Sequence, residues 1–132
     1  MILILRGIPC SGKSTFTAKL KEKYPDAIVI SNDEIRKERN IPFGSEDVNV
    51  YGLEILEDAL KNDKDVIVDN TNIIDETLYR YTRLIKKYNK NYNILEFHIS
   101  LEEALQRNEK RKPSIPPENI ISAYNIFEYM YE

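Results

Sequence analysis

The chain has 132 residues and a formal net charge of −3 at pH 7, and this length predicts a single domain over residues 1–132. Hydrophobic residues make up 42% and charged residues 31%, which is ordinary for a globular protein with its own core. No apolar stretch approaches the roughly 18 residues that a membrane span requires, and the first strand candidate begins too early for a secretion signal. One cysteine excludes an internal disulfide, so we expect a reducing, cytoplasmic setting.

The acidic balance of the chain limits the kinds of partner it can bind. Its isoelectric point lies near 5.3. A protein that wraps duplex nucleic acid along its length needs a basic face, because affinity comes largely from neutralised phosphates. The composition excludes that class, but it is compatible with binding the end of a strand or a small molecule.

Short apolar runs alternate with longer amphipathic segments, which is the pattern of βαβ units and a parallel sheet. The sequence therefore predicts an α/β fold with a central parallel sheet of about four strands flanked by helices. The strands are expected at residues 2–6, 27–30, 66–69 and 94–99.

Helices are expected between these strands and after the last one. Ser31 and Ser100 each precede a glutamate by three positions, which is the capping-box pattern of a helix start. Asp75 is expected to cap another helix, and Pro117 suits the first turn of the last one. The expected helices cover residues 12–24, 32–39, 45–61, 76–88, a segment from 101, and 117 to about 131.

The segment after the first strand is the most informative in the chain. It reads Gly7-Ile8-Pro9-Cys10-Ser11-Gly12-Lys13-Ser14-Thr15 and fits the pattern G-x-x-x-x-G-K-[ST]. Between a strand and a helix, the glycines let successive backbone N–H groups turn toward phosphate oxygens, and the helix presents its positive end. Lys13 can then reach the β- and γ-phosphates, and Ser14 can ligate Mg²⁺. We expect this phosphate loop, residues 7–15, to bind ATP or another nucleoside triphosphate.

Asp33 and Arg36 follow the second predicted strand, and their spacing of three places them on one face of a helix. A carboxylate can accept the proton of a hydroxyl group, and an arginine can hold a phosphate with two parallel hydrogen bonds. The structural alternative is a carboxylate that complements the helix dipole beside a solvated arginine. The phosphate loop in the same chain favours the functional interpretation.

Asp69 ends the third apolar run and is followed by three polar residues. An apolar strand that ends in Asp resembles the second motif of NTPases, whose carboxylate supports Mg²⁺. The structural alternative is a carboxylate that begins an Asx turn. As a functional group, Asp69 would either hold a metal-linked water or clamp a nearby arginine.

Basic residues cluster at the end of the penultimate helix. Arg107 and Arg111 are four positions apart and share a face of that helix, and a proline-rich turn follows them. This arrangement predicts a helical lid that closes over the triphosphate, with Arg111 the better candidate to reach the γ-phosphate. The structural alternative is a basic helix end that complements the dipole.

A few other residues stand out by their chemical type. Cys10 occupies a variable position of the phosphate loop and is expected to be no more than a small residue that fits there. His98, the single histidine, lies on the last predicted strand and is expected to pack rather than act as a base. Tyr51 or Phe43 could stack on a nucleobase.

With these residues placed, nearly the whole chain resembles the kinase domain of the 5′-hydroxyl polynucleotide kinases of bacteriophage and nucleic-acid-repair type. The resemblance is carried by four segments: residues 7–14 of the phosphate loop, Asn32-Asp33-Glu34-Ile35-Arg36, Val68-Asp69-Asn70-Thr71-Asn72, and Gln106-Arg107-Asn108-Glu109-Lys110-Arg111 followed by Ile115-Pro116. It implies a P-loop kinase fold with a C-terminal helical lid, and a cytoplasmic location that includes the cytoplasm of a phage-infected host.

The activity implied by the resemblance is transfer of the γ-phosphate of ATP to the 5′-hydroxyl end of single- or double-stranded DNA or RNA, with Mg²⁺. Asp33 would be the general base and Arg36 would hold a phosphate of the acceptor, in a short basic slot that Lys37, Arg39 or Arg80 could extend. The implied catalytic residues are Lys13, Asp33, Asp69 and Arg111; the nucleotide contacts are residues 7–15, Arg107 and Arg111; and the metal ligands are Ser14, Asp33 and Asp69.

Two alternatives remain open at the level of sequence. The D-x-x-R and D-N-T-N elements also occur in related small kinases that act on tRNA-linked serine, sugars or antibiotics. The chain could therefore be a small-molecule, nucleoside or tRNA-linked substrate kinase. A nucleotide-binding interaction module without catalysis is the other alternative, and the presence of Asp33 and Arg111 argues against it.

Overall fold

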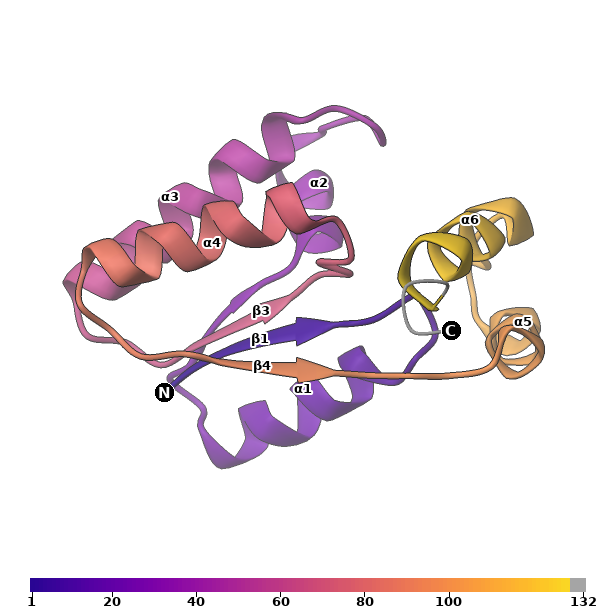
Figure 1. The fold of residues 1–132 in the computed structure, drawn as a ribbon, viewed down its shortest axis with the longest axis horizontal. Coiled ribbons are helices and arrows are strands. Elements are labelled where there is room, and N and C mark those ends of the chain that lie inside the picture. The colour runs from indigo at the N-terminus through magenta and orange to yellow at the C-terminus, as the bar shows by residue number, and fades with distance from the viewer. Residues whose placement is uncertain (129–132) are drawn as a thin grey trace.

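A parallel four-stranded sheet forms the centre of the protein in the computed structural model, which describes residues 1–128. The strand order is β2-β3-β1-β4, so every carboxyl end meets at one edge of the sheet (Figure 1). The strands are β1 (Ile2–Arg6), β2 (Ile28–Ile30), β3 (Val66–Asp69) and β4 (Asn93–Glu96). The predicted α/β class and parallel sheet are confirmed.

Helices cover both faces of the sheet and its carboxyl edge. They are α1 (Lys13–Lys23), α2 (Asn32–Arg39), α3 (Asp47–Lys61), α4 (Asp75–Lys87), α5 (Leu101–Lys110) and α6 (Pro117–Phe127). In Figure 1, α1 lies on one face, α3 and α4 lie together on the other, and α5 and α6 stand beyond the ends of β1 and β4. The last two helices therefore overhang the edge where the strands end.

The central strands β1 and β3 are apolar on both faces because each face is covered, whereas the edge strand β4 is exposed. Ile4 and its neighbours on one face pack against Leu56 of α3 and Tyr81 of α4. On the other face, Leu5 packs in one cluster with Phe16 and Leu20 of α1. Successive side chains of a strand point to opposite faces, so a central strand between two helical layers is a continuous apolar run.

A further apolar cluster fixes the C-terminal helices to the phosphate loop. Ile8, in that loop, is fully buried and packs with Ile73 and with Ile120 and Phe127 of α6. Residues of this kind contribute roughly 1.5–3 kcal/mol each when fully buried. The C-terminal helices are therefore anchored to the loop by packing as well as by chain connection.

The last strand is shorter than predicted. The expectation of residues 94–99 is wrong at its end, because β4 stops at Glu96. Phe97 still donates from its N–H to the Arg6 carbonyl at 2.7 Å, but β1 ends there and the next residues have no strand to pair with. Ile99 is buried instead among the apolar residues of α5 and α6.

The helix starts agree with the predicted capping boxes and differ elsewhere. Ser31 Oγ accepts from the Glu34 N–H at 3.5 Å, and Ser100 Oγ accepts from the Glu103 N–H at 3.2 Å. Asp75 is not the cap of α4, since Ile74 holds that position and Asp75 is the first helical residue. Its carboxylate accepts a hydrogen bond from Arg6 instead, at 3.0 Å.

Other boundaries shift by a few residues. The helix predicted at 45–61 begins at residue 47, where the Ser45 hydroxyl accepts from the Asp47 N–H at 3.3 Å. The end of the last helix, predicted near residue 131, lies outside the described residues. Among residues 1–128, no helix combines the length and the apolar character that crossing a bilayer requires.

Gly52 of α3 gives a test of the packing between α3 and α4. A Cβ atom at this position would lie 2.4 Å from the Tyr81 hydroxyl oxygen and 3.5 Å from Tyr81 Cζ. Gly52→Ala should therefore destabilise the fold by about 1–3 kcal/mol, despite the better helix propensity of alanine. In the Tyr81→Phe background the clash is absent, and Gly52→Ala should be neutral or stabilising. Urea unfolding of the four proteins measures the coupling; additive effects would contradict the proposed contact.

Candidate active site

A cleft of about 750 Å³ lies at the carboxyl edge of the sheet. Its walls come from the phosphate loop, the start of α2, the segment after β3, and the end of α5. Open α/β sheets bind ligands at this edge, and the volume is that of a ligand pocket. Among the described residues, four basic side chains and two carboxylates line it: Lys13, Arg36, Arg107, Arg111, Asp33 and Asp69.

The curl of the phosphate loop depends on its two glycines. A Cβ atom on Gly7 would lie 2.8 Å from the Phe97 carbonyl oxygen and 2.9 Å from Ser11 Oγ, so a larger residue does not fit there. Gly12 has a φ of 104°, a backbone angle that residues with a side chain rarely adopt. The loop then leads directly into α1, whose first residue is Lys13, so the positive end of that helix faces the cleft.

Lys13 is folded back onto its own loop. Its Nζ donates to the Gly7 and Ile8 carbonyl oxygens, both at 2.8 Å, and the side chain is buried. Burial lowers the pKa of Lys13 to about 8, while the Asp69 carboxylate acts in the opposite direction. The ammonium group is thus held among the carbonyl groups of its own loop.

Asp69 lies at the end of β3, beside Lys13 and Thr17. Burial raises the pKa of its carboxyl group; Thr17 and the Lys13 ammonium lower it, and Asp33 raises it further. The Asp69 carboxylate therefore holds its charge less readily than an exposed one, and a cation placed next to it would offset that penalty.

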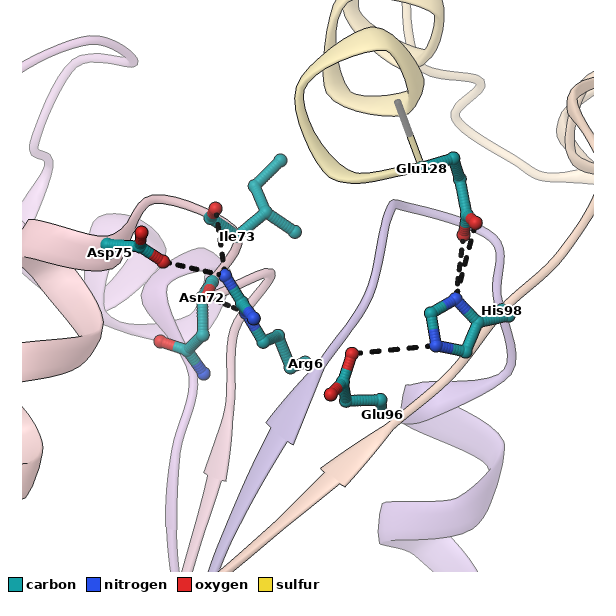
Figure 2. A network of polar contacts seen from close by, with 7 residues as sticks. All are labelled: Arg6, Asn72, Ile73, Asp75, Glu96, His98 and Glu128. Atoms are coloured by element: carbon teal, nitrogen blue, oxygen red, sulfur yellow. Dashed lines mark hydrogen bonds and ion pairs between the residues drawn. The ribbon is translucent and has the colours of Figure 1, made fainter. Parts of the chain in front are cut away.

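The segment after β3 is fastened to the end of β1. The Gly7 N–H donates to the Thr71 carbonyl at 2.9 Å, and Asn72 Nδ2 donates to the Leu5 carbonyl at 2.7 Å. Arg6 is buried and donates from Nε to the Asn72 carbonyl at 2.9 Å and from Nη2 to the Ile73 carbonyl at 3.3 Å (Figure 2). Two loops far apart in sequence therefore form one rigid junction.

Asn70 extends this junction to α2. Its Oδ1 accepts from the Asn32 N–H at 2.7 Å, in the first turn of that helix. Because Asn70 follows Asp69 directly, one segment supplies a cleft carboxylate and also positions the helix that carries Asp33 and Arg36. Asn70 belongs to the resemblance, but no local pattern predicts this contact across 38 positions of sequence.

Asp33 and Arg36 are paired across one turn of α2. Arg36 Nη1 donates to Asp33 Oδ1 at 3.1 Å, and both side chains line the cleft. The Asp33 side chain is 70% exposed, so the pair contributes little to stability and is free to exchange partners. Arg36 Nε and Asn32 Oδ1 are buried and have no hydrogen-bond partner within the described part of the protein. A buried polar atom without a hydrogen-bond partner in the protein is commonly satisfied by a water molecule or a ligand.

The end of α5 supplies the remaining cations. Arg107 Nη1 donates to the Cys10 carbonyl at 3.1 Å, which joins α5 to the phosphate loop. Asn108 is buried and exchanges two hydrogen bonds with the Ile115 backbone, at 2.7 and 2.9 Å. These bonds close the segment between α5 and α6 on which Arg111 stands, and Arg111 lines the cleft.

His98 belongs to a structural cluster away from the cleft. Its Nδ1 lies 3.1 Å from Glu128 Oε1 and its Nε2 lies 3.5 Å from Glu96 Oε2 (Figure 2). The imidazole ring also stacks on Phe127 at 5.1 Å between centroids. His98 does not line the cleft, so the expectation that it packs is confirmed.

The structure brings most of the predicted site residues together. Pro9, Cys10, Ser11, Gly12, Lys13, Ser14, Thr15, Asp33, Arg36, Asp69, Arg107 and Arg111 line the same cleft. Gly7 and Ile8 do not line it: their carbonyl groups hold Lys13, and the Ile8 side chain is core. Arg80 lies elsewhere, in a groove between α3 and α4.

Some lining residues are absent from the predicted set. Phe97 follows β4 and enters the cleft wall, with its ring packed edge-on against Phe16 at 5.6 Å. Ile115 enters through its hydrogen bonds with Asn108. The sequence placed Phe97 inside a strand predicted to run to residue 99, so its position just after the end of β4 is apparent only in the structure.

The donor set of the cleft fits Mg²⁺ bound together with phosphates. Ser14 offers a hydroxyl, and Asp33 and Asp69 offer carboxylates. Across residues 1–128 there is no group of three or more histidine, cysteine, aspartate or glutamate residues that could hold a metal alone. Mg²⁺ commonly binds through one or two carboxylates together with substrate phosphates and water.

The parallel sheet and the loop that leads into α1 define a P-loop nucleotide-binding protein with the kinase fold. Residues 2–122 match the family model described as AAA domain. The chain therefore belongs to the AAA domain family.

Two curated relatives and one solved structure extend this assignment. The chain is 33% identical to L-seryl-tRNA(Sec) kinase of Methanococcus maripaludis, over 97% of this chain and 52% of that protein. It is 27% identical to the "Putative bifunctional polynucleotide kinase/RNA ligase" of Autographa californica nuclear polyhedrosis virus, over 97% of this chain and 22% of that protein. The structure of the Pnkp1/Rnl/Hen1 RNA repair complex superimposes with a TM-score of 0.77 and 23% identity, over 98% of this chain and 44% of that chain. The chain spans about half of the first relative and less of the second.

The buried ammonium group predicts a pH-dependent stability. The pKa of Lys13 is about 8 in the folded protein and 10.5 for the ordinary group, so between these values the unfolded chain binds more protons. The free energy of unfolding of the wild type, relative to Lys13→Met, should therefore rise from pH 8 to pH 10.5 by up to about 3 kcal/mol. Urea unfolding of both proteins across this range measures the difference. A difference that stays constant would contradict the shifted pKa.

Proposed function

We propose that the protein is an ATP- and Mg²⁺-dependent kinase that transfers the γ-phosphate to the 5′-hydroxyl end of a polynucleotide, DNA or RNA. The observation that carries this proposal is the Asp33–Arg36 pair, which faces the same cleft as the phosphate loop. A carboxylate beside an arginine suits an acceptor in which a hydroxyl lies near a phosphate, as at the end of a strand.

On the donor side, the phosphate loop and the start of α1 would hold the β- and γ-phosphates. Lys13 would leave the Gly7 and Ile8 carbonyl groups and pair with phosphate oxygens. Arg107 and Arg111 would neutralise charge on the transferred group, since both line the cleft opposite α2. Such positioning and neutralisation account for most of the catalysis in phosphoryl transfer.

On the acceptor side, Asp33 would take the proton of the 5′-hydroxyl as its oxygen bonds to the γ-phosphorus. The bond from that phosphorus to the β–γ bridging oxygen breaks, and ADP leaves with the electron pair. Arg36 would hold the phosphate between the first and second nucleotides. Asn70 would keep both groups in place through its hydrogen bond to the start of α2.

Ser14, Asp33 and Asp69 are the residues that would hold Mg²⁺. The ion would neutralise charge on the β- and γ-phosphates. Its binding next to Asp69 agrees with a carboxyl group whose pKa is raised by burial, because the cation stabilises the ionised form.

One relative favours a second candidate function. The 33% identity with L-seryl-tRNA(Sec) kinase supports a tRNA-linked serine as acceptor, whose hydroxyl Asp33 would deprotonate in the same way. The two functions differ in what lies next to the hydroxyl. In an oligonucleotide with a 5′-hydroxyl end, a phosphate follows the first nucleoside, and Arg36 would bind that phosphate. A seryl ester carries no phosphate at that position.

Acceptor profiling tests the proposal directly. With labelled ATP and Mg²⁺, the wild type should label a 5′-hydroxyl oligonucleotide and prefer a nucleoside 3′-monophosphate over the plain nucleoside by on the order of 10- to 100-fold. Arg36→Gln should remove this preference. Lys37→Gln should keep it, because Lys37, which the sequence suggested as part of the slot, is largely exposed and does not line the cleft. Labelling of seryl-tRNA or a small metabolite without labelling of the oligonucleotide would exclude the proposed acceptor.

Asp33→Asn tests the base. The amide cannot accept the hydroxyl proton, so kcat should fall by roughly 10²- to 10⁴-fold while the affinity for ATP stays nearly unchanged. The matched control is Glu34→Gln on the same turn, whose carboxylate lies 4.0 Å from Lys37 and does not line the cleft. Full activity of Asp33→Asn would remove Asp33 from this role, and loss of ATP binding would point to a lost metal ligand or a structural effect instead of a lost base.

A further inference from the structure

Phe43 is the most exposed large apolar side chain of the described residues, at 78%. It lies beside the acceptor side of the cleft, because the Arg36 guanidinium sits over its ring at 5.0 Å from the centroid. Arg36 itself lines the cleft and pairs with Asp33. The ring therefore borders the place where the acceptor would enter.

The loop that carries Phe43 is fixed on both sides. Before it, the Ile41 N–H donates to the Arg36 carbonyl at 3.1 Å, and the Ile41 side chain packs against the core below α3. After it, the Ser45 N–H donates to the Pro42 carbonyl at 3.2 Å, and Gly44 has a φ of 92°. A four-residue turn with a positive φ at its third position places the second residue, Phe43, at the corner.

Tyr51 lacks this exposure. Its ring packs against the core formed by α3 and α4, and the Arg39 guanidinium covers it at 4.0 Å. Of the two aromatic residues that the sequence suggested for stacking, the structure therefore leaves Phe43 as the candidate. An exposed aromatic ring that is held in place is stabilised by stacking against another flat, apolar group.

We propose that Phe43, held by Arg36, is the stacking platform for the 5′-terminal nucleobase of the acceptor. The inference rests on the proposed function, since it assumes a nucleotide whose hydroxyl meets Asp33 and whose 3′-phosphate meets Arg36. The base and the 3′-phosphate are carried by the same sugar, so a nucleotide whose phosphate is held by Arg36 brings its base within reach of the ring that lies against that guanidinium. The Phe43 ring is the apolar surface at that position.

This geometry predicts how the acceptor is recognised. Stacking uses the π-face that every base presents, so the platform favours nucleotides over small alcohols without selecting a particular base. The Arg36 guanidinium, whose Nη1 pairs with Asp33 at the cleft wall, would bind the phosphate. Base and phosphate would then be held by two neighbouring groups.

The test compares two oligonucleotides that differ only at the first position, one with a normal 5′ nucleotide and one with an abasic tetrahydrofuran residue. For the wild type, kcat/KM should fall on the order of tenfold or more with the abasic end. Phe43→Ala should show the same fall with the normal acceptor and little further change with the abasic one. The KM for ATP should stay constant in both proteins.

Two variants serve as controls. Phe43→Tyr keeps an aromatic face and should retain the preference for the normal end. Tyr79→Ala removes a ring that is 60% exposed on α4, outside the cleft, and should behave as the wild type.

The outcomes separate the two proposals. Equal labelling of normal and abasic ends by the wild type, or an unchanged preference in Phe43→Ala, would overturn the stacking platform and leave the kinase function standing. Absence of labelling at either end, together with labelling of another alcohol, would overturn the proposed function and the platform with it.

Discussion

The hydrogen bonds between the end of β1 and the segment after β3 are the contacts on which the rest of the cleft depends. The Gly7 N–H and the Arg6 guanidinium donate hydrogen bonds to that segment. Asn70, in the same segment, accepts a hydrogen bond from the first turn of α2. Because parallel strands end at one edge, a few such bonds bring a phosphate loop, a carboxylate and a second helix start to one place. Their geometry is set before any ligand binds, which is the condition for electrostatic catalysis.

Two kinds of charge environment meet across this junction. On the donor side, Lys13 is buried, and burial lowers its pKa to about 8. The charge that remains is stabilised by the loop carbonyl groups and by the Asp69 carboxylate. On the acceptor side, Asp33 and Arg36 are more exposed and neutralise each other. A polyanion that enters the donor side relieves an existing penalty, while a partner on the acceptor side has only to displace a weak surface pair.

Much of the fold could be predicted from the sequence because the strands are short apolar runs and the helix starts carry capping boxes. The predictions failed where a distant partner decides the structure. Asp75 pairs with Arg6 rather than capping α4, and the strand predicted to reach residue 99 stops at Glu96, the partner of the last residue of β1. The phosphate loop was recognisable from local chemistry. The position of Asn70 was not, because its contact joins loops that are close only in the folded chain.

The ion pair between Asp33 and Arg36 bears on a side reaction of kinases, the hydrolysis of ATP by water. A kinase that binds ATP also holds a group that water can attack, and a free carboxylate nearby would orient that water. In the ligand-free protein, Arg36 Nη1 occupies one oxygen of the Asp33 carboxylate, at 3.1 Å. Before an acceptor binds, only the other oxygen is open to water; in the proposed reaction the acceptor phosphate would draw the weakly held arginine away as the hydroxyl reaches the carboxylate.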